Sequence, residues 1–278
     1  MEKYMFKEKY TLSFRAKPTG GGALNGSLQF GNIDALKRAS SITFVTHGYN
    51  VTEKDGKYRL SNFVRMLGDT GQDAIVSVLW PGDNWLGALA YPFKGRMADD
   101  TGRRLALYIR DAGLGGASLS FVSHSLGARV VMETIKALPN TYAFNQVCLM
   151  AAAVDDDCLT VLKQYQPLMH RIRRVAVLAS KWDSVLLAAY PLGDLTHFFQ
   201  DFGNKPGLAL GLHGPRPKVI DRVHYVQIDN VEPDARAGHG HYLPTPESKP
   251  FVQKKREAAA RFAQEVIKNE PSPVYKIK

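Results

Sequence analysis

A short loop of mostly small residues carries the strongest chemical signal in this 278-residue sequence. The letters SHSLG at 123–127 stand between an apolar run at 118–122 and a helical pattern over 126–138. A strand that turns directly into a helix forces a tight turn, and its central residue projects at the helix N-terminus. The pattern predicts a nucleophilic Ser125 hydroxyl exposed above a sheet, and a Leu126 N–H that faces the oxygen of a reacting carbonyl. The plainer interpretation is a small-residue turn that begins an ordinary helix.

A second loop, HGYN at 47–50, follows the apolar run SITFVT. Gly48 lets the backbone approach a substrate closely, and the Tyr49 N–H is then a second donor to the same oxygen. Two such donors form an oxyanion hole, in which one donor is typically worth about 10²–10³ in rate. We expect His47 to shape this loop rather than to act as a base. A plain glycine turn is the alternative.

A nucleophilic serine needs a general base, and the base needs an acid that orients it. On turns of this kind the acid and the histidine follow the serine in that order along the chain. Asp183 ends the apolar run RRVAVLAS and is the favoured acid, because the acid usually follows the penultimate strand. Asp155 is the alternative acid, although the cluster 155–157 also suits a helix cap. No further ligand flanks that cluster, so we expect no metal site there.

The candidate bases lie in GHGHY at 238–242, in a glycine-flanked loop after the last predicted strand. Either His239 or His241 can be the base, and the other would then support it or face the substrate. A His-x-His pair also suggests metal binding, but no Cys or third ligand clusters with it. His124 lies inside the SHSLG turn and is expected to point down beside the strand.

The elements that must position these loops alternate along the chain. Apolar runs predict strands at 9–15, 42–46, 74–80, 118–122, 145–151, 174–179 and 222–229. Helical spacing predicts helices at 57–67, 97–109, 126–138 and 252–266, and the glycine-rich stretch 19–26 predicts a loop. The pattern indicates one α/β domain over 1–278, with a mostly parallel sheet covered by helices on both faces. In such sheets, sites form at the carboxyl ends of the strands.

Two irregular stretches can wall a pocket above that edge. The segment 184–221 is rich in Leu, Gly, Pro and aromatic residues and predicts a lid or pocket wall, and 80–93 offers a second apolar wall. Packing on the core or in a dimer interface is the alternative. The two walls favour a small-molecule or lipid-like substrate with an apolar acyl group. No phosphate loop or dinucleotide motif is present, so we expect no cofactor.

The net charge of +10 raises the question of nucleic acid or anionic membranes as partners. Residues 249–278 hold eight Lys or Arg and three Glu, which is about half of the excess. No nucleic-acid motif accompanies this tail, so we expect no nucleic-acid binding and, at most, weak contact with an anionic membrane. The two cysteines form no disulfide scaffold, and no run is long enough to span a membrane or serve as a secretory signal. These features favour a cytoplasmic location.

The segments HGYN, SHSLG, AAAVDDDCL, LASKWDSVL and GHGHYL, in this order, resemble the α/β-hydrolase superfamily. More narrowly they resemble a little-characterised bacterial branch of it, a domain of unknown function, over about residues 40–250. The resemblance implies Ser125 as the nucleophile and Asp183 as the acid, and it favours His239 as the base. Ser123 stands where Gly or Ala is usual in that branch, and Ala128 stands where Asn is common.

The combined signals predict a serine hydrolase of carboxylic esters with a Ser-His-Asp triad. The same groups also serve thioesters, amides or acyl transfer. The alternative is a non-catalytic interaction protein that keeps the fold, because fold alone does not imply function.

Overall fold

The computed structural model describes residues 9–83, 91–160, 162–188, 208–228, 236–246 and 249–269. The described strands are β1 (Lys9–Arg15), β2 (Ala23–Phe30), β3 (Ser41–Thr46), β4 (Ala74–Leu79), β5 (Ser118–His124), β6 (Phe144–Met150), β7 (Ile172–Ala179) and β8 (Val223–Gln227). The described helices are α1 (Ile33–Arg38), α2 (Glu53–Leu67), α3 (Tyr91–Asp111), α4 (Gly127–Ala137), α6 (Leu210–His213) and α7 (Pro250–Lys268). None of these helices is both long and apolar enough to cross a membrane.

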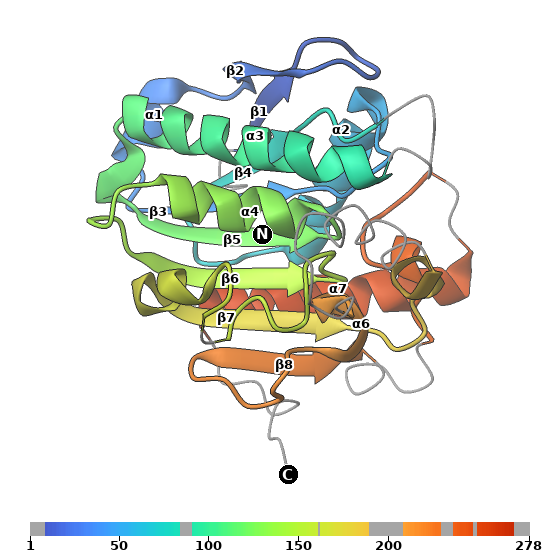
Figure 1. Ribbon diagram of the computed structural model, residues 1–278. Helices are drawn as coiled ribbons and strands as arrows, with labels where there is room; N and C mark the ends of the chain where they lie inside the picture. Colours follow the sequence, from blue (N-terminus) through green and yellow to red (C-terminus); the bar gives the residue numbers. More distant parts are fainter. Residues whose placement is uncertain are drawn as a thin grey trace, which may run out of the picture.

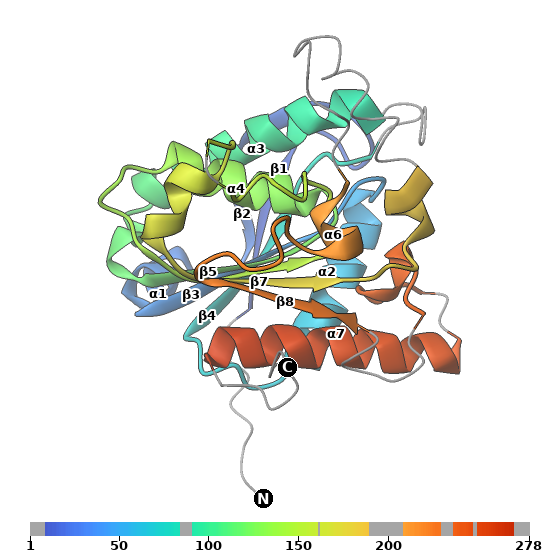
Figure 2. The ribbon, with the colours of Figure 1, turned by 60° about the horizontal axis from the view of Figure 1, so that its bottom comes forward.

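The described strands form one sheet in the order β2-β1-β4-β3-β5-β6-β7-β8 (Figure 1). Every neighbouring pair is parallel except β1 and β2, which run antiparallel at one edge. Helices cover both faces of this sheet, with α3 and α4 on one side and α2 and α7 on the other (Figure 2). The prediction of an α/β fold with a mostly parallel sheet is therefore confirmed.

The edge strand β2 corrects one expectation. The glycine-rich stretch 19–26 is predicted to be a loop, but the chain enters β2 at Ala23. This strand is largely exposed, so it lacks the apolar pattern that predicts a buried strand. Pairing with β1 forms it instead, and Gly26 approaches β1 so closely that a Cβ there would lie 2.8 Å from the Phe14 ring.

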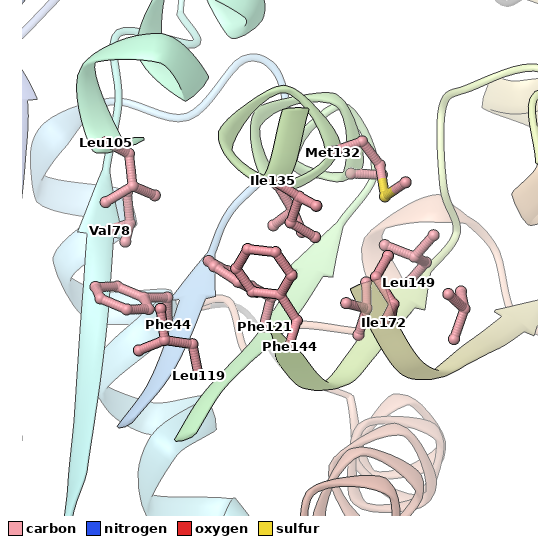
Figure 3. Close-up of a cluster of buried hydrophobic side chains, with 14 of the residues drawn as sticks. Phe44, Val78, Leu105, Leu119, Phe121, Met132, Ile135, Phe144, Leu149 and Ile172 are labelled. Carbon is pink, nitrogen blue, oxygen red and sulfur yellow. The ribbon is translucent and has the colours of Figure 1, made fainter. Parts of the chain in front are cut away.

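The interior beneath α3 and α4 is built around three aromatic rings. Phe44, Phe121 and Phe144 form a row, with neighbouring ring centres 5.5 and 5.9 Å apart (Figure 3). The three rings come from β3, β5 and β6, which are adjacent strands. Their packing fixes the three strands that lead into the HGYN loop, the SHSLG turn and the loop that contains Asp155.

The register of the strands brings those loops to one edge. Thr46, the last residue of β3, lies opposite Ser123 of β5. His124 lies opposite Met150 of β6, which in turn lies opposite Leu178 of β7. Because the pairs are parallel, the loops after these strands leave the sheet at the same edge.

Part of the predicted lid or pocket wall at 184–221 lies outside the described residues, namely 189–207. Its described end includes α6, where the Gly211 amide donates to the Ala152 carbonyl and the Gly211 carbonyl accepts from the Ser180 amide, both at 2.9 Å. Helix α6 therefore lies against the ends of β6 and β7. Residues 84–90 of the second wall are also outside the described set, so both walls, like the single-domain boundary, stay predictions.

Candidate active site

The SHSLG segment forms a strained turn between β5 and α4. Ser125 has φ of +56°, a left-handed conformation that costs a non-glycine residue about 1–3 kcal/mol. Backbone hydrogen bonds hold it on both sides: its N–H donates to the Met150 carbonyl (2.9 Å), and its carbonyl accepts from Ala128 (3.0 Å) and Ala153 (3.2 Å). The turn is therefore fixed by β6 and α4 together, which aims the Ser125 side chain away from the strand.

The structure brings Ser125, His239 and Asp183 into one hydrogen-bonded row. His239 Nε2 lies 2.7 Å from Ser125 Oγ, and His239 Nδ1 lies 2.7 Å from Asp183 Oδ2. Asp183 is fully buried, and its Oδ1 accepts hydrogen bonds from the Val185 and Leu186 amides at 3.1 and 3.0 Å. A carboxylate held in this way accepts a hydrogen bond from the Nδ1–H group, which keeps the proton on Nδ1 and leaves Nε2 as the acceptor for the serine hydroxyl.

The accessibility of Ser125 differs from the sequence prediction. Its hydroxyl is predicted to be exposed, yet the residue is only 2% exposed. A Cβ on Gly48 would lie 2.7 Å from Ser125 Cβ, which shows how tightly the HGYN loop covers the turn. His239, with a side chain 17% exposed, closes another side. The HGYN loop and His239 therefore enclose the Ser125 side chain.

His241, the alternative base, has a different position. Its Nδ1 accepts a hydrogen bond from the Gly238 amide at 3.0 Å and so caps the short 3-10 helix His239–His241. The ring stands edge-on to Phe251, with 6.1 Å between the centroids. Burial lowers the pKa of His241, and Lys255 and Arg256 lower it further. These contacts give His241 a role in holding the loop.

The acidic cluster that includes Asp155, the alternative acid, lies in an ion-pair group of its own. Asp156 pairs with Arg216 at 3.1 Å, and Asp157 pairs with Lys163 at 3.0 Å. The backbone of Asp155 bridges to Ala209. Within the part of the chain that the structure describes, no group of three His, Cys, Asp or Glu residues is arranged to hold a metal ion.

The expected oxyanion donors, Tyr49 and Leu126, flank the serine. Leu126 directly precedes α4, so its N–H has no partner within the helix. His47 Nδ1 donates to the Gly48 carbonyl at 2.9 Å, and a trans peptide then directs the Tyr49 N–H to the opposite side. The His47 carbonyl accepts from Trp80 Nε1 at 2.8 Å. His47 therefore shapes the loop that carries the second donor.

Burial lowers the pKa of His47 to about 3, so the ring is neutral. Its Nδ1 carries the proton and its Nε2 faces the Trp80 amide at 3.3 Å. Behind Trp80, the buried Arg15 donates to the Trp80 carbonyl (2.8 Å) and to Asp83 (2.5 Å). The Gly82 carbonyl then accepts from the Asn50 amide at 3.0 Å. Sequence reasoning missed this support, because Arg15 ends an ordinary alternating strand and no local pattern marks it.

His124 lies beside His239, which corrects the expectation that it points down along the strand. Its Nε2 donates to the His239 carbonyl at 2.9 Å, and the two ring centroids are 4.9 Å apart. Burial, and then the charge of His239, lower the pKa of His124 well below its usual range. The two residues are 115 positions apart in sequence, so only the folded chain reveals the contact.

Comparisons with known proteins identify the fold family. Solved structures with a related fold include a carboxylesterase from Mesorhizobium loti, at 16% identity over 80% of this chain and 90% of that one, with a TM-score of 0.39. Another is esterase 2 from Thermogutta terrifontis, at 12% identity over 96% of this chain and 98% of that one, with a TM-score of 0.44. Among curated proteins, none matches the chain. Residues 29–196 match the α/β hydrolases of unknown function designated DUF900, and the chain therefore belongs to this family.

Proposed function

We propose that this α/β hydrolase is a serine hydrolase that cleaves carboxylic esters. The observation that carries the proposal is the continuous row Ser125–His239–Asp183, with both contacts at 2.7 Å and the serine in a strained turn. A chance grouping of these side chains would not also place the buried acid on the far nitrogen of the base. The row has the geometry that nucleophilic catalysis by serine requires.

In the proposed reaction, Ser125 Oγ attacks the ester carbonyl while His239 Nε2 takes its proton. Asp183 keeps the Nδ1 proton in place and stabilises the imidazolium that forms. The Leu126 and Tyr49 amides stabilise the oxyanion. His239 then gives the proton to the leaving alkoxide, which departs as the alcohol. Water, activated by the same base, releases the acid and restores Ser125.

An apolar acyl or alcohol group suits the surroundings of the acid. Trp182, Val185 and Leu187 flank Asp183, and each is at least 45% exposed. Exposed apolar side chains beside a site favour an apolar ligand, as the two predicted walls do. Thioesters, amides and acyl transfer use the same catalytic groups. Assays with a panel of substrates must therefore define the leaving group.

The experiment is hydrolysis of p-nitrophenyl esters of graded chain length by the wild type and three variants. Ser125→Ala and His239→Ala are expected to lose about 10⁴-fold or more in kcat/KM, because either change removes the triad. His241→Ala is the matched control and is expected to stay within about 10-fold, because His241 caps a short helix and contacts Phe251, while His239 contacts Ser125.

A fluorophosphonate probe separates the proposal from a non-catalytic interaction protein. Labelling of the wild type and not of Ser125→Ala supports a reactive serine. A wild type that hydrolyses none of the esters and also ignores the probe would contradict the proposal and favour the interaction protein. Loss of activity in His241→Ala with a retained rate in His239→Ala would reassign the base.

A further inference from the structure

Within the described residues, two arginines on neighbouring helices lack some of the partners that buried charges normally have. Arg256 of α7 is 3% exposed, and its described hydrogen bond runs from Nη2 to Thr245 Oγ1 at 2.6 Å. Its Nε is buried without a hydrogen-bond partner, and so is the Nε of Arg59 on α2. In the described parts of the chain neither guanidinium forms an ion pair with a carboxylate. A buried charge without a partner is costly, so this arrangement needs a physical explanation.

Two other arginines of the chain, both buried, have hydrogen-bond partners for their guanidinium groups. Arg15 donates to Asp83 and to the carbonyls of Val51 and Trp80. Arg171 donates to three backbone carbonyls at 2.7–3.2 Å. Arg59 and Arg256 therefore differ from Arg15 and Arg171, whose Nε atoms donate to the Lys17 and Tyr142 carbonyls.

The two guanidiniums belong to the same level of the structure. Helices α2 and α7 lie on the same face of the sheet and both begin at its carboxyl edge (Figure 2). Gln264 of α7 donates to the Asp69 carbonyl, just beyond α2, at 2.9 Å. Arg256 lies eight residues before Gln264, and Arg59 lies eight residues before Leu67, the last residue of α2; the rise of about 1.5 Å per residue therefore puts both residues near one level.

The electrostatic environment agrees with this placement. Burial lowers the pKa of Arg256, and the charge of Arg59 lowers it further. Burial also lowers the pKa of Arg59, and only Asp55, one turn earlier on α2, opposes it. A second like charge beside a buried guanidinium marks a place where an anion would be stabilised.

We propose that Arg59 and Arg256 form a binding site for a compact oxyanion between α2 and α7. The planar guanidinium fork matches the paired oxygens of a phosphate or a carboxylate group. Thr245, which holds Arg256, lies six residues after His239 on the same segment. An anion at this site therefore also steadies the segment that carries the proposed base.

The test is thermal unfolding of the full chain in Tris-chloride, with sodium phosphate titrated against sodium chloride at equal ionic strength. Phosphate is expected to raise Tm in proportion to the logarithm of its concentration above Kd, by about 5 °C at about 100 times Kd. Arg59→Gln is expected to lose this rise, and so is Arg256→Gln. The matched control Arg65→Gln, an exposed arginine on the same helix, is expected to keep it.

The general stabilisation by phosphate acts on every variant alike, so the difference between the wild type and Arg59→Gln isolates the site. A parallel titration with sodium malonate tells a carboxylate from a phosphate site. An Arg59-dependent rise of Tm with the logarithm of the concentration of either anion supports the proposal. Equal responses of the wild type and Arg59→Gln to both anions would overturn it. Because Arg59 is only partly buried, its variant keeps the test valid if Arg256→Gln does not fold.

Discussion

Replacing Asp183 by Asn exchanges one carboxylate oxygen for an amide nitrogen. The change is expected to move the imidazole proton of His239 from Nδ1 to Nε2. Oδ1 of Asp183 accepts from two backbone amides, those of Val185 and Leu186. An asparagine must keep its carbonyl oxygen there, because the opposite orientation loses two buried hydrogen bonds at about 1–3 kcal/mol each. The NH₂ group then faces His239 Nδ1, which must become the acceptor. The imidazole proton moves to Nε2, where it donates to Ser125 Oγ and the general base is lost.

The expected loss follows from that tautomer. General base catalysis is worth about 10²–10⁴, and the corresponding change in other Ser-His-Asp triads costs about 10⁴. We expect kcat/KM of Asp183→Asn to fall about 10³–10⁴-fold, which corresponds to about 4–5.5 kcal/mol of transition-state stabilisation. The fold is expected to survive, because side-chain volume and both amide contacts are retained.

The assay is hydrolysis of the best p-nitrophenyl ester, with circular dichroism as the check on folding. Asp155→Asn is the matched control, since Asp155 is the other acid that the sequence offers and Asp183 holds His239 Nδ1. It is expected to keep activity within a few-fold. A folded Asp183→Asn with more than a tenth of the wild-type kcat/KM would refute the reasoning, and a large loss in Asp155→Asn would move the acid to that position.

Three further outcomes follow from neighbouring contacts. His124→Phe keeps a ring but loses the hydrogen bond to the His239 carbonyl, so kcat should fall about 10–100-fold with KM little changed, and an unchanged kcat would exclude a positioning role. His47 is neutral down to about pH 3 when folded, whereas the unfolded chain takes up the proton below about 6.5. The contribution of His47 to the free energy of unfolding is thus complete above about pH 6.5 and is lost as the pH falls towards 3, by about 1.4 kcal/mol per pH unit. Urea unfolding at pH 7, 6 and 5 should therefore show a smaller loss of stability with falling pH for His47→Gln than for the wild type. Gly127→Ala puts a Cβ 2.5 Å from the His47 carbonyl and should lower the free energy of unfolding by about 1–3 kcal/mol, whereas Gly116→Ala meets nothing within 4 Å and should cost less than about 0.5 kcal/mol.

Much of the fold was predictable because its signals are local. Apolar runs such as 74–80 and 118–122 identify buried strands, and their alternation with helical patterns indicates a parallel sheet. The resemblance of five ordered segments to the α/β-hydrolase superfamily is confirmed by the family match. The edge strand β2 was not predictable, since pairing with β1 and not apolar content defines it. Arg15 gave no signal either, because its partners are brought to it only by folding.

The sequence by itself determined which residue types stand after which strand, and hence that Ser125, Asp183 and a histidine of 238–242 gather at one edge of the sheet. Strand order and residue spacing are properties of the chain, so they can be derived without coordinates. The residues alone left His239 and His241 open and the resemblance favoured His239, but only the tertiary structure shows that the His239 ring faces Ser125 while the His241 ring caps a short helix. It also decided that the serine is enclosed. Such outcomes depend on contacts between residues far apart in sequence, for which no local pattern exists.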